Sequence, residues 1–237
     1  MTREAAPVPV TARRLRTTVV AGLAALVLAA CGTNLAGAAS VVGDRTVSDA
    51  EVATAVNEVR AQIEAAQGVQ GVPAFDEKQV TSRNVERMTR HLLFETAAAE
   101  KGIVITPSQV DEIIAGSVDG QFGGDRAKLD LAFAAQEFVP ASAVVEFARD
   151  FLIRQALPAK VLPGGTEEAQ GTAASAYLKE LSEKLGVEVA PRYGTWVPAQ
   201  VGLGPVPDDL SFVPGKSTPA PQTGGASPSP SPSPTSS

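Results

Sequence analysis

The feature that most constrains the fold of this chain is a series of amphipathic helical segments, two of which begin with a complete capping signal. Ser48-Asp49-Ala50-Glu51 is a capping box, in which the side chains of Ser48 and Glu51 each accept a hydrogen bond from the other's backbone N–H. Thr106-Pro107-Ser108-Gln109 has the same form, with Pro107 at the first helical position. An amphipathic helix buries its apolar side against another element, so these segments predict a packed, mainly helical domain.

Apolar residues recur at helical spacing in six segments between residues 48 and 186. The apolar residues of these segments are Val52, Ala55, Val56, Val59 and Ile63; Val80, Val85, Met88, Leu92 and Leu93, expected on the buried side of the second helix; Val110, Ile113 and Ile114; Leu129, Leu131, Ala132 and Phe133; Val144, Val145, Phe147, Ala148, Phe151, Leu152 and Ile153; and Ala174, Tyr177, Leu178, Leu181 and Leu185. We expect the third helix to be short and to end before a loop at residues 119–126. The fifth, from near Pro140, is apolar over a wide arc, so it lies at the centre of the core or offers apolar surface to a partner.

Short strands are expected at both ends of this helical region. Residues 41–47 read as two strands around the Gly43-Asp44 turn, and Val187-Glu188-Val189 reads as one more strand. We expect the strands from the two ends to pair, which would pack the last helix back onto the first. The predicted fold class is therefore mainly α, with about six helices and short paired strands at its start and end.

The amino-terminal residues are typical of an export signal. Arg13, Arg14 and Arg16 precede residues 17–30, an apolar run without charge that is too short to span a bilayer core of about 30 Å. Its end, Leu28-Ala29-Ala30-Cys31, resembles the lipobox of bacterial lipoproteins. That resemblance implies that Cys31, the only cysteine, carries an acyl anchor such as palmitate and that the leader is cut before it. The alternative is an ordinary secretory leader cut near Ala38.

Charge and composition divide the chain and limit its partners. The net charge is −6, and removing a leader of net +3 leaves −9, so the chain lacks the basic surface that nucleic acid requires. The Pro-, Ser- and Gly-rich end is expected to be a disordered tail, either solubilising or glycosylated. We therefore divide the chain into a signal peptide at 1–30, a tether at 31–39, a helical domain at 40–201 and a tail at 202–237. Richness in Ala, Gly, Val, Pro and Arg fits a high-GC bacterium of the actinobacterial kind.

The order of these motifs resembles the amino-terminal chaperone domain of the SurA/PrsA family. The resemblance is carried by the lipobox, Val41-Val42-Gly43-Asp44, the capped helix after it, and Tyr177-Leu178 followed by VEVAPRYGTW. It implies an extracytoplasmic chaperone that holds unfolded exported chains in an apolar, partly open cradle of helices. Family members often insert a parvulin-type prolyl isomerase between the late helices. Here LPAKVLPGGT leaves no room for it, and paired histidines are missing, so isomerase activity is not carried over.

The sequence contains no motif typical of a catalytic, metal-binding or cofactor-binding site. His91 is the single histidine, there is no HExxH or CxxC spacing, and GQFGG is not followed by the Lys-Ser/Thr of a phosphate-binding loop. We expect His91 at the edge of the core. We expect the carboxylates of Asp111, Glu112, Glu137 and Glu146 on solvated helix faces. Tyr193 and Trp196 either pin a terminal segment to the core, which we favour, or form a peptide-binding platform.

Two functions of different class follow from the sequence. The first is a lipid-anchored, ATP-independent holdase on the outer face of the cell membrane, with unfolded or folding exported polypeptides as its partners. The second is an adaptor or structural lipoprotein that binds one folded partner. An enzyme is disfavoured because no nucleophile, metal cluster or cofactor motif is present. A promiscuous apolar surface would favour the holdase, and a single well-packed binding site would favour the adaptor.

The lipobox yields the first testable prediction. Replacing Cys31 with Ala removes the thiol that an acyl chain would modify, so acylation and cleavage before residue 31 should both be lost. Detergent-phase partitioning and the mass of the mature amino terminus measure the two effects. An Ala variant that partitions and is processed like the unaltered chain would refute the lipobox interpretation.

Overall fold

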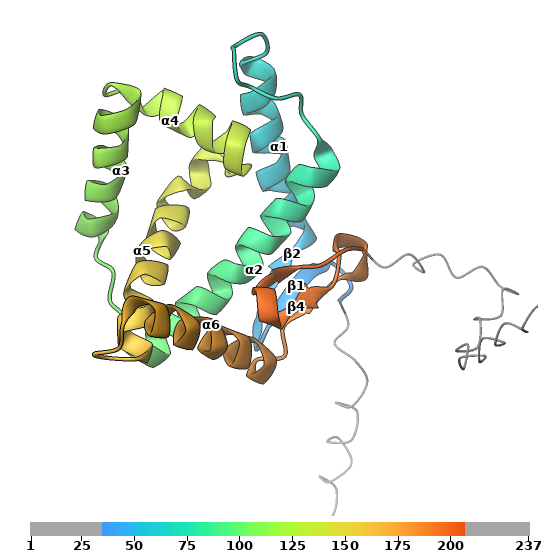
Figure 1. The fold of residues 1–237 in the computed structure, drawn as a ribbon. Helices are drawn as coiled ribbons and strands as arrows, with labels where there is room; N and C mark the ends of the chain where they lie inside the picture. Colours follow the sequence, from blue (N-terminus) through green and yellow to red (C-terminus); the bar gives the residue numbers. More distant parts are fainter. Residues whose placement is uncertain (1–34, 207–237) are drawn as a thin grey trace, which may run out of the picture. The chain divides into compact units, whose positions relative to one another are not determined.

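The computed structural model describes residues 35–206, and every structural statement below concerns these residues (Figure 1). The predicted signal peptide, Cys31 and most of the predicted tail lie outside them. Six α-helices are present, as predicted. They are α1 (Asp49–Ala65), α2 (Glu77–Lys101), α3 (Pro107–Phe122), α4 (Arg126–Ala132), α5 (Val144–Val161) and α6 (Glu167–Lys184).

Both predicted capping boxes form. In the first, the backbone N–H of Glu51 donates to Ser48 Oγ at 3.2 Å, and that of Ser48 donates to Glu51 Oε2 at 2.7 Å. In the second, the backbone N–H of Gln109 donates to Thr106 Oγ1 at 3.3 Å, and that of Thr106 donates to Gln109 Oε1 at 2.9 Å. Because each box satisfies backbone donors that a helix start leaves free, these two helices begin where the sequence indicates.

The short third helix is a wrong prediction. Helix α3 continues through Phe122, so the first half of the expected loop at residues 119–126 is helical, and the turn comes only at Gly123, whose φ is 62°. A π-helix, η1 (Phe133–Glu137), follows α4, and a short 3-10 turn, η2 (Ala141–Ala143), precedes α5. Between these two segments, Phe138 has a φ of 57°, a conformation that non-glycine residues rarely adopt.

The predicted pairing of strands from the two ends of the domain is confirmed. Strand β1 (Ala38–Val42) lies between β2 (Arg45–Ser48) and β3 (Glu188–Val189), antiparallel to both. In the register, Val41 faces Thr46 on one side and Glu188 on the other. A second sheet that the sequence did not indicate pairs β4 (Trp196–Val197) with β5 (Gly202–Leu203), so the described fold continues past residue 201.

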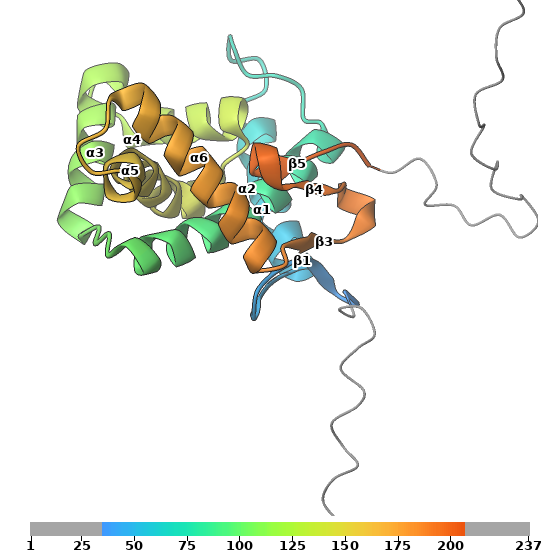
Figure 2. The ribbon, with the colours of Figure 1, turned by 60° about the horizontal axis from the view of Figure 1, so that its bottom comes forward.

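Helix α2 is the central element of the packing. It contacts α1, α5, α6, strand β1 and strand β5 (Figures 1 and 2). Its residues Val80, Val85 and Leu93 are fully buried, together with Ile153 on α5 and Val59 on α1. Helix α6 packs mainly on α5, on the 3-10 turn η4 (Pro198–Gln200) and on α2, so the expectation that the last helix covers the first is wrong in its partner. The carboxyl-terminal part of the domain is joined to its amino-terminal end by the pairing of β3 with β1 instead.

Helix α5 fulfils both of the alternatives expected for it. Val144, Ile153 and Leu157 are buried in the core, whereas Val145 is 53% exposed. Phe147 is half-buried and meets Phe133 edge to face, with ring centroids 5.3 Å apart. One side of the helix therefore holds the core together, and the other leaves apolar surface open.

Within residues 35–206, no single helix is both long and apolar enough to cross a membrane. Two consecutive helical segments, Arg126–Glu137 and Ala141–Val161, are together long and apolar enough for a membrane span, but they meet at an angle of 99°.

The packing of α6 and β3 yields a second prediction. A chain that ends at Gly165 loses the buried Leu181 and leaves the edge of β1 unpaired, so it should unfold at lower urea concentration and less cooperatively. Deleting one such leucine side chain alone costs about 2–5 kcal/mol. A chain that ends at Gly204 keeps both sheets and serves as the control. Equal urea curves for the two truncations would contradict a structural role for the late helix.

Candidate functional site

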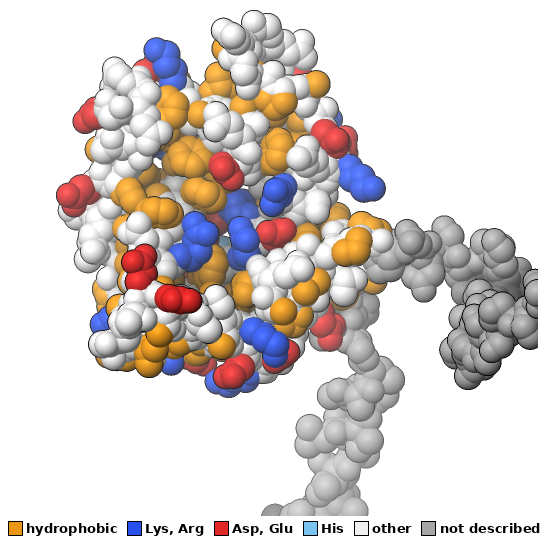
Figure 3. Space-filling model, viewed as in Figure 1, with side chains coloured by type: hydrophobic (Ala, Val, Ile, Leu, Met, Phe, Trp, Pro, Cys, Tyr) orange, Lys and Arg blue, Asp and Glu red, His pale blue; other side chains and the backbone are white. Residues whose placement is uncertain are grey.

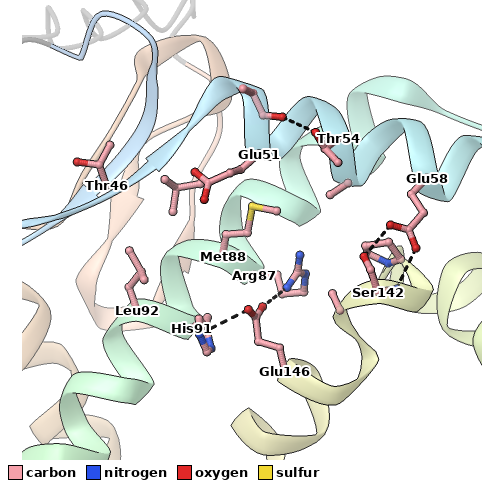
Figure 4. Close-up of a pocket in the computed structure, with 15 residues that line it drawn as sticks. Thr46, Glu51, Thr54, Glu58, Arg87, Met88, His91, Leu92, Ser142 and Glu146 are labelled. Carbon is pink, nitrogen blue, oxygen red and sulfur yellow. Dashed lines mark hydrogen bonds and ion pairs between the residues drawn. The ribbon is translucent and has the colours of Figure 1, made fainter.

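A pocket of about 470 Å³ lies between β2, the first turns of α1, the middle of α2 and the start of α5 (Figure 4). The residues that line it are Thr46, Val47, Ala50, Glu51, Thr54, Ala55, Glu58, Arg87, Met88, His91, Leu92, Pro140, Ser142, Ala143 and Glu146. Met88 and Leu92 are half-buried and give the pocket an apolar surface beside its polar groups. The volume falls in the range of small-ligand and side-chain binding sites.

Glu146 joins two helices at one side of the pocket. Figure 4 shows its carboxylate between Arg87 and His91, both on α2. Arg87 Nη1 donates to Glu146 Oε1, and His91 Nε2 lies 3.5 Å from Glu146 Oε2. The Arg87 side chain is only 9% exposed, so its charge needs this partner. The expectation that Glu146 lies on a simple solvated face is therefore wrong.

Asn84 fixes the buried end of this network. It is fully buried, and its Nδ2 donates to two backbone carbonyls, those of Val80 and Phe138, each at 2.9 Å. Its Oδ1 accepts from Arg87 Nη2 at 3.3 Å. The Phe138 carbonyl belongs to the residue with positive φ, so Asn84 holds the strained turn that leads into α5.

His91 links the network to a second carboxylate. Its Nδ1 lies 2.9 Å from Oδ1 of Asp150, whose side chain is 9% exposed. Burial lowers the pKa of His91, but the hydrogen bond to Asp150 and the charges of Asp150, Glu146 and Glu95 outweigh it, so the pKa lies above the ordinary 6.5. Burial raises the pKa of Asp150 above its ordinary 3.8, although the contact with His91 works against it.

The same histidine is part of the one group of possible metal ligands found among residues 35–206. Ligand atoms of His91, Glu95 and Asp150 all lie within 4.8 Å of one another. Within this group Asp150 already contacts His91, and two members have partners outside it: Glu95 accepts from Arg149 Nε at 2.7 Å, and His91 Nε2 lies 3.5 Å from Glu146 Oε2. Arg149 also donates to the carbonyl of Ile105 at 2.8 Å, which holds it in place. Ion pairing accounts for the arrangement.

Glu58 and Ser142 close the far side of the pocket. The backbone N–H and the Oγ of Ser142 donate to the Glu58 carboxylate at 2.9 and 2.6 Å. The Ser142 hydroxyl thus bonds a carboxylate rather than a histidine, and the described lining offers no nucleophile paired with a general base. The geometry suits binding.

The other residues singled out in the sequence lie away from this pocket. Asp111, Glu112 and Glu137 are exposed, as expected. Trp196 is 7% exposed within the core, and Tyr193 Oη donates to Asp49 Oδ1 at 3.0 Å. Both aromatic residues therefore hold the terminal segment against the domain, in agreement with the favoured interpretation. Sequence reasoning missed Asn84, Arg87 and Asp150, whose partners lie on other elements.

The helical frame, the small closing sheet and the pocket define a helical binding domain. The chain belongs to the SurA-like N-terminal domain family, whose pattern matches residues 11–157, more than half of its length. The predicted resemblance is thereby confirmed. A SurA-like N-terminal domain is a chaperone-type, non-catalytic domain, and such domains bind unfolded polypeptides. No curated protein and no solved structure matches the chain.

The raised pKa of His91 yields a third prediction. The folded chain binds this proton more tightly than the unfolded chain, so the stabilisation is complete below pH 6.5 and is lost as pH rises through the folded pKa. Replacing His91 with Gln should lower the free energy of unfolding by roughly 1–3 kcal/mol at about pH 6, and by less at about pH 8.5. Urea unfolding across that range measures it, and parallel stability curves for the two proteins would contradict the assignment.

Proposed function

We propose that this protein is a lipid-anchored extracytoplasmic holdase, which binds unfolded exported polypeptides without ATP and without catalysing prolyl isomerisation. The observation that carries the proposal is the pocket of about 470 Å³, open to solvent and partly apolar, in a domain of a family that binds unfolded polypeptides. Unfolded chains expose apolar side chains, which such a pocket removes from water.

Apolar side chains in the pocket and on α5 support a binding role with many clients. Met88 and Leu92 line the pocket, and Val145 on α5 is more than half exposed. Phe147 and Leu152 on α5 are partly buried against the core. Apolar contacts do not require strict geometry, which suits clients of different sequence.

The site of action is proposed from the sequence. The basic and apolar leader that ends at Cys31 favours export followed by acylation. Two acyl chains would hold the domain stably at the outer face of the cell membrane, whereas one gives only marginal binding.

The absence of isomerase activity is proposed from the connection between α5 and α6. Helix α5 ends at Val161 and α6 begins at Glu167, so only a short loop joins them. That loop cannot contain the domain that family members often insert there. The single histidine also differs from the paired histidines of parvulin sites.

The rigid polar network favours the second candidate, an adaptor for one folded partner. Asn84, Arg87 and Glu146 hold one side of the pocket in a fixed geometry. A fixed, well-packed site is typical of selective recognition. Crosslinking in intact cells distinguishes the two functions, because a holdase is captured with many partners and an adaptor with one.

The fourth prediction tests the holdase function directly. The chain from Gly32 to Ser237 should slow the aggregation of two unrelated unfolded clients at several-fold excess, without ATP, and should leave a proline peptide's isomerisation rate unchanged. Thr54→Trp fills the pocket from the exposed face of α1 and should weaken protection roughly threefold or more. Asn57→Trp, exposed on the same helix but outside the pocket, is the matched control.

The aggregation and isomerisation assays distinguish the holdase from the adaptor and from an enzyme. If neither client is protected, the holdase proposal fails and the adaptor is favoured. If the chain accelerates isomerisation and His91→Gln abolishes this, the non-enzyme assignment fails. If Thr54→Trp and Asn57→Trp lose protection equally, clients do not bind in the pocket.

A further inference from the structure

A second cavity borders the polar network at Arg87 and Asp150, and we call it the arginine hollow. It has a volume of about 210 Å³ and is lined by Arg87, Arg90 and Phe94 from α2 and by Phe147 and Arg154 from α5, with Asp150 and Glu137 beside them. On each helix these residues recur three or four positions apart, so the two helices present one face each to the hollow. Figure 3 shows Lys and Arg side chains gathered at the middle of this face, between α2 and α5, with hydrophobic side chains next to them.

The carboxylates near the hollow are engaged elsewhere, with one exception. Asp150 contacts His91 at 2.9 Å, Glu146 accepts from Arg87, and Glu86 pairs with Arg90 Nη1 at 3.0 Å. Glu137 is exposed and forms no ion pair with Arg154. Arg87 and Arg90 are thus each paired with one carboxylate, Arg90 through Nη1, whereas Arg154 is paired with none of these acidic groups.

Arg154 has no hydrogen-bonding or ion-pairing partner within the part of the chain that the structure describes. Its guanidinium lies 5.9 Å from the Phe151 ring centroid, a weak contact. Burial and then the charge of Arg90 lower the pKa of Arg154, whereas the charges of Asp150 and Glu137 raise it. Arg90 and Arg154 therefore lie close enough for their like charges to oppose each other, and neither nearby carboxylate bonds to Arg154. Such an arrangement is unfavourable in the empty hollow and favourable when an anion binds there.

We infer that the arginine hollow binds a carboxylate of the polypeptide held by this domain, with Arg90 and Arg154 as donors and Phe94 and Phe147 against the neighbouring apolar groups. The inference rests on the proposed holdase function and names a preferred client chemistry. A guanidinium group can donate two parallel hydrogen bonds to a carboxylate. The aromatic rings can pack against apolar side chains that flank the acidic residue of a bound peptide. The chain as a whole carries −6, so this positive hollow departs locally from its overall charge.

The test compares two probes that differ only in charge. One is a short fluorescein-labelled peptide with both ends capped, containing phenylalanines on either side of one aspartate, and the other has asparagine in that position. The chain from Gly32 to Ser237 should bind the aspartate peptide about fivefold to tenfold more tightly by fluorescence anisotropy. High salt should reduce the difference.

Three variants assign the preference to the hollow. Arg154→Gln and Arg90→Gln should each remove most of the preference, while binding of the asparagine peptide changes little. Arg45→Gln, which removes the same charge from an exposed position on β2 outside the hollow, should keep it. Equal binding of the two peptides by the unaltered chain, or equal loss in Arg45→Gln, would overturn the inference.

A second measurement separates this inference from the holdase proposal. Titration with acetyl-Phe-Asp-amide should shift the arginine Nε–H signals of Arg90 and Arg154 in ¹H–¹⁵N spectra, and acetyl-Phe-Asn-amide should not. If neither long peptide binds but these shifts occur, the holdase proposal fails and the carboxylate site stands. If the long peptides bind equally and no shift occurs, the carboxylate site fails and the holdase proposal stands.

Discussion

The packing of α5 against α2 is the contact on which the rest of this structure depends. It combines fully buried apolar side chains, such as Leu93 and Ile153, with an ion-paired network in which Glu146 meets Arg87 and Asp150 meets His91. A buried charge without a partner is strongly destabilising, so the two helices satisfy these charges only in one relative position. The network therefore fixes the alignment of the helices, and the apolar contacts supply most of the stability.

This alignment also creates the two cavities. Arg87 lines both the pocket and the arginine hollow, whereas His91 and Glu146 line the pocket and Asp150 lines the hollow. Their chemistry differs, because the pocket is partly apolar with carboxylates from α1, whereas the hollow is rich in guanidinium groups. A polypeptide that occupies both would meet an apolar site and a cationic site a short distance apart. That combination suits the proposed holdase function, in which chains of varied sequence bind and their segments are distinguished.

The sequence predicted the local structure well and the long-range polar contacts poorly. Capping boxes and apolar periodicity depend on residues three or four positions apart, so the starts of α1 and α3 and the mainly helical class were correct. The partners of Arg87, His91 and Asn84 lie 54 to 59 residues away, and nothing local specifies them. One signal was present, since these three polar residues share a face of α2 at spacings of three and four. The full length of α3 was missed because the glycines near its end indicated a loop. The β4–β5 sheet was missed because strands of two residues are too short to show a periodic pattern.

The position of β1 has a consequence for the order in which the domain is completed. This strand is the centre of its sheet, yet one of its two neighbours, β3, lies about 150 residues further along the chain. A chain is synthesised from its amino end, so the edge of β1 stays open until nearly the whole domain has emerged. During that interval the growing chain has the exposed strand edge and uncovered apolar helices of a folding client. A domain that binds unfolded chains thus passes through the same state as its clients, and completion of the sheet by β3 ends it.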